Sequence, residues 1–232
     1  MKTVFITGIN RGLGKALFNL FSTKGYFVYG LLRNEEAAKL LIKENLNNVK
    51  IIQADLASDT AIQRIQAIVQ DQPIDFLINN AGISGKEFLL ENIPSSEISQ
   101  LFEVHCLGVF RTVKALRKNL LQADNPIVLN LNSRLGSITR QSNGTYQHLT
   151  SSYSYRIAKA AQNMLTNCFR AEFKGKIQFL SIHPGRMKTE IAHSDADVEP
   201  ATIAQRLWMD YENNQLKEEN GIVELGKEIM EW

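Results

Sequence analysis

The chain has 232 residues, of which 44% are hydrophobic and 22% are charged, and its formal net charge is +2 at pH 7. A chain of this length can bury one substantial core, so we expect residues 1–232 to form a single domain. There is no block of like charge and there are only two cysteines, which argues against a nucleic-acid or membrane surface, a disulfide framework and a cysteine-based metal site.

Six short apolar runs, each bounded by turn-forming residues, predict buried β-strands. The first run follows Met1 without the charged region and longer apolar stretch of a leader. No window approaches the roughly 18 apolar residues of a membrane-spanning helix, so we expect a cytoplasmic protein. The predicted strands cover residues 2–7, 26–32, 49–54, 74–80, 126–132 and 176–184.

Segments with helical periodicity separate these strands. Such alternation predicts βαβ units, and therefore a doubly wound parallel sheet with helices on both faces. Its ligand crevice lies at the carboxyl ends of the strands. The predicted helices cover residues 12–24, 35–45, 59–71, 96–122 and 152–173.

Two long irregular stretches, residues 134–151 and 184–200, each follow a predicted strand. Loops of this length in an α/β domain are usually functional. Residues 220–232 predict a last edge strand followed by a turn and an anchoring Trp232.

Three glycines mark the junction between the first strand and the first helix. Gly8, Gly12 and Gly14 have the spacing G-x-x-x-G-x-G rather than the common G-x-G-x-x-G. Glycines at a helix N-terminus let the backbone approach a pyrophosphate, towards which the free N–H groups point. The cluster alone would also suit a simple strand-to-helix turn, but its position in a βαβ series favours a phosphate loop.

Tyr155 and Lys159 stand four residues apart in a predicted helix, so their side chains share one face. An ammonium at roughly 4 Å in an effective dielectric of about 20 contributes about 4 kcal/mol, enough to lower the pKa of a phenol by about 3 units. Such a tyrosine can exchange a proton with a carbonyl or alcohol oxygen. The spacing alone also fits a half-buried tyrosine beside a solvated lysine.

Three motifs together resemble the short-chain dehydrogenases/reductases: TGINRGLG at residues 7–14, NNAG at residues 79–82, and Tyr155-x-x-x-Lys159. The segments NLNSRLGSI and HPGRMKT, with the final Trp232, resemble the C-factor and sniffer-type carbonyl reductases. The resemblance implies a Rossmann-type sheet of about seven strands in the order 3-2-1-4-5-6-7. It also implies an oxidoreductase that uses a nicotinamide cofactor, and a homodimer or homotetramer.

The resemblance also assigns cofactor contacts. Asp55 and Leu56 would flank the adenine, residues 80–82 would lie along its ribose, and residues 184–189 would hold the nicotinamide. By itself, Asn80 would also suit a turn. The implied cofactor-binding residues are Gly8, Asn10, Arg11, Gly12, Leu13, Gly14, Arg33, Asp55, Leu56, Asn80, Ala81, Gly82, Tyr155, Lys159, Pro184, Gly185, Met187 and Thr189.

The residue after the second predicted strand indicates which nicotinamide cofactor binds. An acid there would bind the ribose hydroxyls of NAD, whereas a base accommodates the 2′-phosphate of NADP. This chain has Arg33, with no acid before Glu35, and Arg11 adds a second guanidinium. Both arginines could instead be ordinary surface residues, but together they favour NADPH over NADH.

The catalytic serine has two candidates. In the family a serine hydroxyl binds the substrate oxygen, a tyrosine acts as acid or base, and a lysine assists both the tyrosine and the nicotinamide ribose. Ser133 follows a predicted strand, whose direction would aim it into the crevice, and it matches the local family pattern. The more usual distance from the tyrosine would point to Ser142. We expect Ser133, Tyr155 and Lys159 to act together; Tyr153, with no lysine four residues on, is the weaker tyrosine.

A fourth family residue is missing. His105 occupies the position, three residues before Gly108, where the family has an asparagine that connects the lysine to solvent. Histidine can also donate and accept hydrogen bonds, so we expect it either to join the proton relay or to be a packed helix residue. If it joins the relay, His105→Asn should flatten any pH dependence near neutrality.

Two functions follow from this pattern. The first is an NADPH-dependent carbonyl reductase acting on a small ketone, aldehyde or alcohol. The alternative is an NADP(H)-binding sensor or signalling protein of the same fold with little turnover. We expect residues 186–200 to form a lid, and Tyr146, Gln147 and His148 either to line the substrate pocket or to lie in a surface loop.

Overall fold

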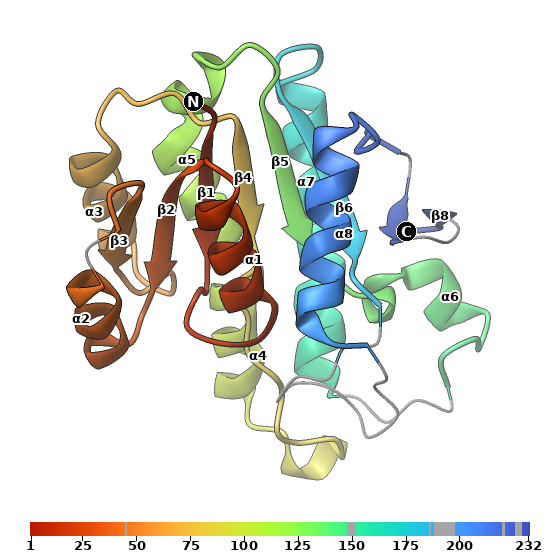
Figure 1. The fold of residues 1–232 in the computed structure, drawn as a ribbon. Helices are drawn as coiled ribbons and strands as arrows, with labels where there is room; N and C mark the ends of the chain where they lie inside the picture. Colours follow the sequence, from red (N-terminus) through yellow and green to blue (C-terminus); the bar gives the residue numbers. More distant parts are fainter. Residues whose placement is uncertain (45, 148–151, 186, 188–197, 220, 226–228) are drawn as a thin grey trace.

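The computed structural model describes residues 1–44, 46–147, 152–185, 187, 198–219, 221–225 and 229–232. Within these residues the strands form one sheet in the order β3-β2-β1-β4-β5-β6-β7-β8 (Figure 1). All neighbouring strands are parallel except β7 and β8. The strands are β1 Thr3–Thr7, β2 Phe27–Leu32, β3 Val49–Gln53, β4 Phe76–Asn79, β5 Ile127–Leu131, β6 Gln178–His183, β7 Ile222–Glu224 and β8 Ile229–Met230.

Helices connect the strands and cover both faces of the sheet (Figure 1). None of those described combines the length and apolar character that a membrane crossing requires. The α-helices are α1 Gly12–Thr23, α2 Glu35–Lys43, α3 Thr60–Val69, α4 Ser95–Phe102, α5 Gly108–Leu121, α6 Ile138–Ser142, α7 Tyr153–Glu172 and α8 Pro200–Glu212. Short 3-10 turns η1 and η3 cover Leu90–Asn92 and Arg134–Gly136, and the π-helical segment η2 covers Glu103–Leu107.

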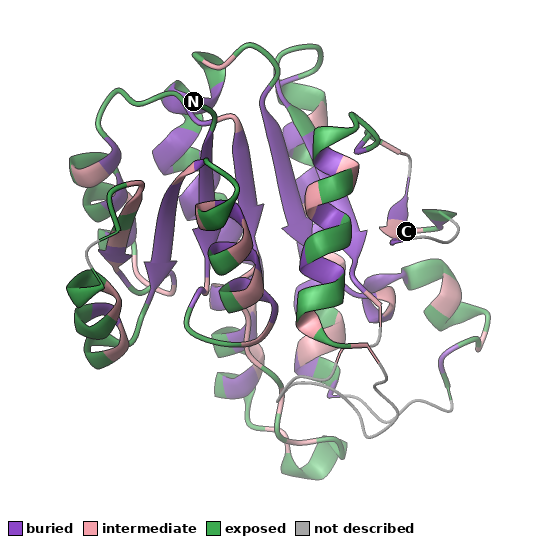
Figure 2. Ribbon diagram, in the orientation of Figure 1, coloured by how far each residue is buried: buried purple, intermediate pink, exposed green. Residues whose placement is uncertain are grey.

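The sheet separates two apolar layers because its strands are apolar on both sides, as parallel strands covered by helices must be. Figure 2 shows the central strands of the sheet buried and the outer sides of the helices exposed. One layer contains side chains of α1 and α8, where Phe76 stacks on Tyr211 with ring centroids 4.3 Å apart. The other contains side chains of α3, α5 and α7. This layering confirms the predicted Rossmann-type sheet, to which β8 adds an antiparallel edge.

The structure corrects the sequence prediction in three helical regions. The helix predicted over residues 96–122 is interrupted by η2, and wider turns of this kind occur frequently at functional sites. Helix α8 was not predicted, although Pro200 at its first turn is a typical start signal. Part of the irregular stretch 134–151 is also helical, as η3 and α6.

Candidate active site

The glycine loop has a shape that strongly favours glycine. Gly8 and Gly12 have φ values of 74° and 53°, in the left-handed region. A Cβ on Gly14 would lie 2.1 Å from the carbonyl oxygen of Gly8. Arg11 at the start of α1 makes no side-chain capping hydrogen bond, and there is no acidic residue in the first turn. The backbone N–H groups at this helix end therefore fit an anionic diphosphate.

Asn80 at the end of β4 holds this loop in place. Its side-chain nitrogen donates to the carbonyl oxygens of Thr7 and Gly8, at 2.9 and 3.1 Å. In return, the Thr7 hydroxyl oxygen accepts from the backbone N–H groups of Asn80 and Ala81, each at 3.0 Å. The side chain of Asn80 is thus committed to joining β1 to β4.

The two arginines expected near a 2′-phosphate are both exposed, Arg33 after β2 and Arg11 before α1. The loop lies beside the end of β2 because the N–H groups of Gly8 and Ile9 both point at the carbonyl oxygen of Leu31, at 2.7 and 3.4 Å. Arg33 lies two residues beyond that carbonyl, so the structure puts it close to the glycine loop.

The remaining expected cofactor contacts differ in exposure. Asn10 and Asp55 are exposed, and Leu13 and Leu56 have buried side chains. The carbonyl oxygen of Leu56 accepts from Arg111, 3.0 Å away, which ties the segment after β3 to α5. Because the side chain of Leu13 is buried, Leu13 would contact a cofactor through its backbone alone.

The segment after β6 is described in part. Pro184 is buried, Gly185 has a φ of 93°, and Met187 forms an isolated bridge with Val198. Thr189 and most of the expected lid lie outside the described residues.

Ser133 and Tyr155 meet at the carboxyl end of β5. Ser133 is 7% exposed, and its hydroxyl hydrogen-bonds the Tyr155 phenol. Ser152, the N-cap of α7, accepts from the N–H of Tyr155 at 3.1 Å and so fixes the start of the helix. The rival Ser142 is exposed, and its hydroxyl donates to the carbonyl oxygen of Ile138 at 2.7 Å within its own helix.

Lys159 is buried one turn further along α7. Its ammonium donates to the carbonyl oxygen of Leu131 at 2.7 Å and to the side-chain oxygen of Gln162 at 3.0 Å. Its nitrogen lies 5.8 Å from the centre of the Tyr155 ring. Burial lowers the pKa of Lys159 to about 7.

The expected lowering of the tyrosine pKa is wrong for this structure. Burial raises the pKa of Tyr155 to about 12, and the hydrogen bond from Ser133 only partly opposes that effect. Desolvation outweighs attraction here because the phenolate would lose its water while the ammonium bonds to Leu131 and Gln162. The phenol is therefore protonated over the whole neutral range.

His105 lies in η2, buried against the same site. Its ring is perpendicular to that of Tyr155, with centroids 5.4 Å apart, and its Nε2 is 2.8 Å from the carbonyl oxygen of Ile83. Burial, with the charge of Lys159, lowers the pKa of His105 to about 3. The imidazole is therefore neutral near pH 7, which favours the packed helix residue over a relay that titrates near neutrality. A Cβ on Gly82 would lie 2.7 Å from this ring, so glycine is needed beside it.

A buried amide network that the sequence analysis missed holds the Ser133 segment. Asn132 bonds Asn163 of α7, and its side-chain oxygen accepts from the N–H of Ser133 at 2.8 Å. Asn163 in turn donates to the carbonyl oxygen of Gly136 at 3.1 Å and accepts from Ser181 at 2.8 Å. The signal was the asparagine pair in the strand run PIVLNLN, since a buried amide needs partners.

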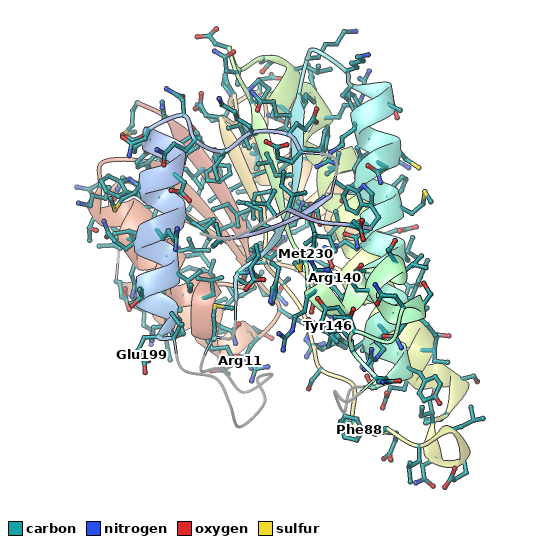
Figure 3. All side chains as sticks on the ribbon, turned by 90° about the vertical axis from the view of Figure 1, so that its right-hand side faces the viewer. Arg11, Phe88, Arg140, Tyr146, Glu199 and Met230 are labelled. Carbon is teal, nitrogen blue, oxygen red and sulfur yellow. The ribbon has the colours of Figure 1, made fainter. Side chains whose placement is uncertain are left out.

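Of the expected pocket-lining residues, the structure describes Tyr146 and Gln147, and these two differ in exposure. Tyr146 is 4% exposed and bonds Arg140 and Met230, so it joins α6 to β8 (Figure 3). Gln147 is exposed, and His148 lies outside the described residues. The hydroxyl of Ser137 and the N–H of Thr139 donate to the carbonyl oxygens of Glu231 and Trp232, at 2.6 and 2.9 Å, which fastens the last residues to the segment after Ser133.

No group of three or more histidines, cysteines or acids within the described ranges could hold a metal ion. The described residues bring together a glycine loop at the start of α1 and, beyond β5, a serine, a tyrosine and a lysine. The short chain dehydrogenase model matches residues 2–199. The chain belongs to the short chain dehydrogenase family.

Individual relatives agree with this assignment. An NADPH-dependent 3-dehydrocapnine reductase of Ornithobacterium rhinotracheale is 29% identical over 82% of this chain and 67% of its own length. The C-signal protein of Myxococcus xanthus is 32% identical over 53% of this chain and 72% of its own.

The carbonyl reductase Sniffer of D. melanogaster superposes over the full length of both chains with a TM-score of 0.83 and 26% identity. NADPH-bound carbonyl reductase from chicken fatty liver has a TM-score of 0.87 at 21% identity, over 100% of this chain and 99% of its own, a likeness of fold.

Proposed function

We propose that this family member is an NADPH-dependent carbonyl reductase that acts on a ketone or aldehyde, with Tyr155 as the acid. The observation that carries the proposal is the hydrogen bond between Ser133 and Tyr155, with the Lys159 ammonium on the next turn. Ser133 follows β5, and Tyr155 and Lys159 lie on α7; because β1, β4 and β5 are parallel, Ser133 and the glycine loop lie beyond the same, carboxyl ends of the strands.

Each group has a distinct task in the reduction. Ser133 holds and polarises the carbonyl oxygen, and Tyr155 donates its proton to that oxygen. The high pKa of Tyr155 keeps it protonated until it reacts. The developing phenolate is stabilised by the Ser133 hydroxyl and by the positive charge of Lys159. NADPH, when bound, supplies the hydride for the carbonyl carbon.

NADPH is proposed over NADH because Arg11 within the glycine loop and Arg33 just after β2 are both exposed, and a 2′-phosphate dianion bound there would meet two guanidinium groups. The NADPH dependence of the Ornithobacterium relative supports the same choice.

A substrate panel tests the proposal. Aldehydes, ketones and quinones are offered with NADPH or NADH to the parent protein, to Tyr155→Phe and to Tyr153→Phe. Tyr153 is the matched control, because it is 48% exposed and has no lysine four residues on. We expect NADPH oxidation in the parent and in Tyr153→Phe, and a loss of about 10²-fold or more in Tyr155→Phe. Equal activity of the two variants would contradict the assigned role.

The same panel distinguishes the reductase from the alternative, a nucleotide-binding sensor. Stoichiometric NADPH binding by the parent, without oxidation by any carbonyl, would favour the sensor. The neutral, buried His105 at the place of the family asparagine is the observation that keeps this alternative in view.

A further inference from the structure

Gln162 is a buried polar residue that the proposed reaction leaves without a task. It lies on α7, three residues after Lys159, and is 2% exposed. Burying a primary amide is costly unless it makes hydrogen bonds. Its side-chain oxygen lies 3.0 Å from the ammonium nitrogen of Lys159, so it accepts a bond from a charged donor.

The ammonium of Lys159 is held by neutral oxygens alone. Its acceptors are the carbonyl of Leu131 at the end of β5 and the amide of Gln162. The titratable groups that face it are Tyr155 on its own helix and His105 from η2. Among the described residues, no carboxylate forms an ion pair with it. Gln162 is therefore the one polar side chain in this set that stabilises the charge by a direct bond.

This arrangement leaves the lysine one donor for other work. An ammonium has three N–H donors, and Leu131 and Gln162 accept two of them. The third remains for a hydroxyl of the cofactor ribose. Because the two fixed acceptors come from different elements, β5 and α7, they restrict the direction of the third N–H.

We propose that Gln162 is a positioning residue, which holds the Lys159 ammonium in place and helps it keep its proton in a buried site. The catalytic consequence rests on the proposed function, whereas the effect on Lys159 itself does not. Losing the amide oxygen makes the charged lysine less stable, and replacing it by a carboxylate makes it more stable.

Two variants of similar size test the idea in opposite directions. Gln162→Met removes the acceptor, and Gln162→Glu supplies a negative one. The pKa of Lys159 is followed by NMR in ¹³C-lysine-labelled protein without added cofactor, and its signal is assigned by its absence in Lys159→Met. We expect the pKa of Lys159 to rise by about 1 to 3 units in Gln162→Glu and to fall in Gln162→Met.

The control and the kinetic readout separate positioning from mere packing. Gln66→Glu makes the same change at an exposed position on α3 and should leave Lys159 unaffected. In the reductase assay, the pH at which kcat falls on the alkaline side should move up in Gln162→Glu and down in Gln162→Met. A purely structural role would lower activity in both variants without moving this pH in opposite directions.

The outcomes are distinguishable from those of the reductase proposal. If the pKa of Lys159 is the same in the parent, Gln162→Met and Gln162→Glu, the role of Gln162 is refuted even when the parent reduces carbonyls. If the pKa moves as expected but the parent reduces no carbonyl, Gln162 keeps its role and the reductase proposal fails. Should Gln162→Met not fold, the shift in Gln162→Glu decides alone.

Discussion

The proposed cofactor region and the proposed catalytic region are built differently. Around the glycine loop the important groups are backbone atoms, held by glycine conformations and by the bonds of Asn80. At the end of β5 they are buried side chains, whose charges depend on what surrounds them. A loop made of backbone can be recognised from residue type, whereas the state of a buried ionisable group depends on the whole packed structure.

We expect the largest loss of activity from a substitution of Ser133. Ser133→Ala removes the hydroxyl that bonds Tyr155, so we expect kcat to fall by about 10²- to 10³-fold. Ser142→Ala, at an exposed hydroxyl bonded within its own helix, should cost less than threefold. Steady-state kinetics on the best carbonyl of the panel measures both. The reverse order would transfer the catalytic role to Ser142.

At the cofactor end, Arg33→Asp should change specificity rather than chemistry. The substitution places a negative charge where we propose the 2′-phosphate lies, so we expect kcat/KM for NADPH to fall by about tenfold or more relative to NADH. Lys174→Asp is the control, because it makes the same charge change at an exposed position in the turn before β6, at the opposite end of the strands from Arg33. An unchanged ratio in Arg33→Asp would refute the assigned contact.

The smallest effect concerns His105 and acid stability. Its pKa is about 3 in the folded chain, while an unfolded histidine titrates near 6.5. Between these values the unfolded state binds more protons, so His105 makes stability fall as the pH falls, by up to about 1.4 kcal/mol per pH unit.

His105→Asn removes that contribution. Urea unfolding from about pH 8 to about pH 4 should therefore show a shallower acid loss in the variant than in the parent. Above about pH 7 the two slopes should agree, which serves as the internal control. Parallel curves throughout would mean that His105 titrates in the folded chain as it does in the unfolded chain.

The difference between a backbone loop and buried side chains also explains which features could be predicted from the sequence. The positions of the strands and of the glycine loop were predictable because both depend on local patterns, apolar runs and glycine spacing, whereas the order of the sheet came from the resemblance to the family. The side chain of Ser133 was placed by the direction of its strand. The pKa of Tyr155 was predicted in the wrong direction, and the choice between the two roles of His105 stayed open, since desolvation was not visible. The bond between Gln162 and Lys159 was missed because nothing in their spacing shows that both are buried.

The most direct test of the central claim is a single-turnover measurement with Tyr155→Phe. The variant is first saturated with NADPH, and binding is measured separately by fluorescence. It is then mixed with the carbonyl that the parent reduces best. The account predicts that NADPH binds within about threefold of the parent affinity, while the rate of its oxidation falls by about 10²-fold or more. Oxidation at the parent rate would contradict the role of Tyr155 as the acid.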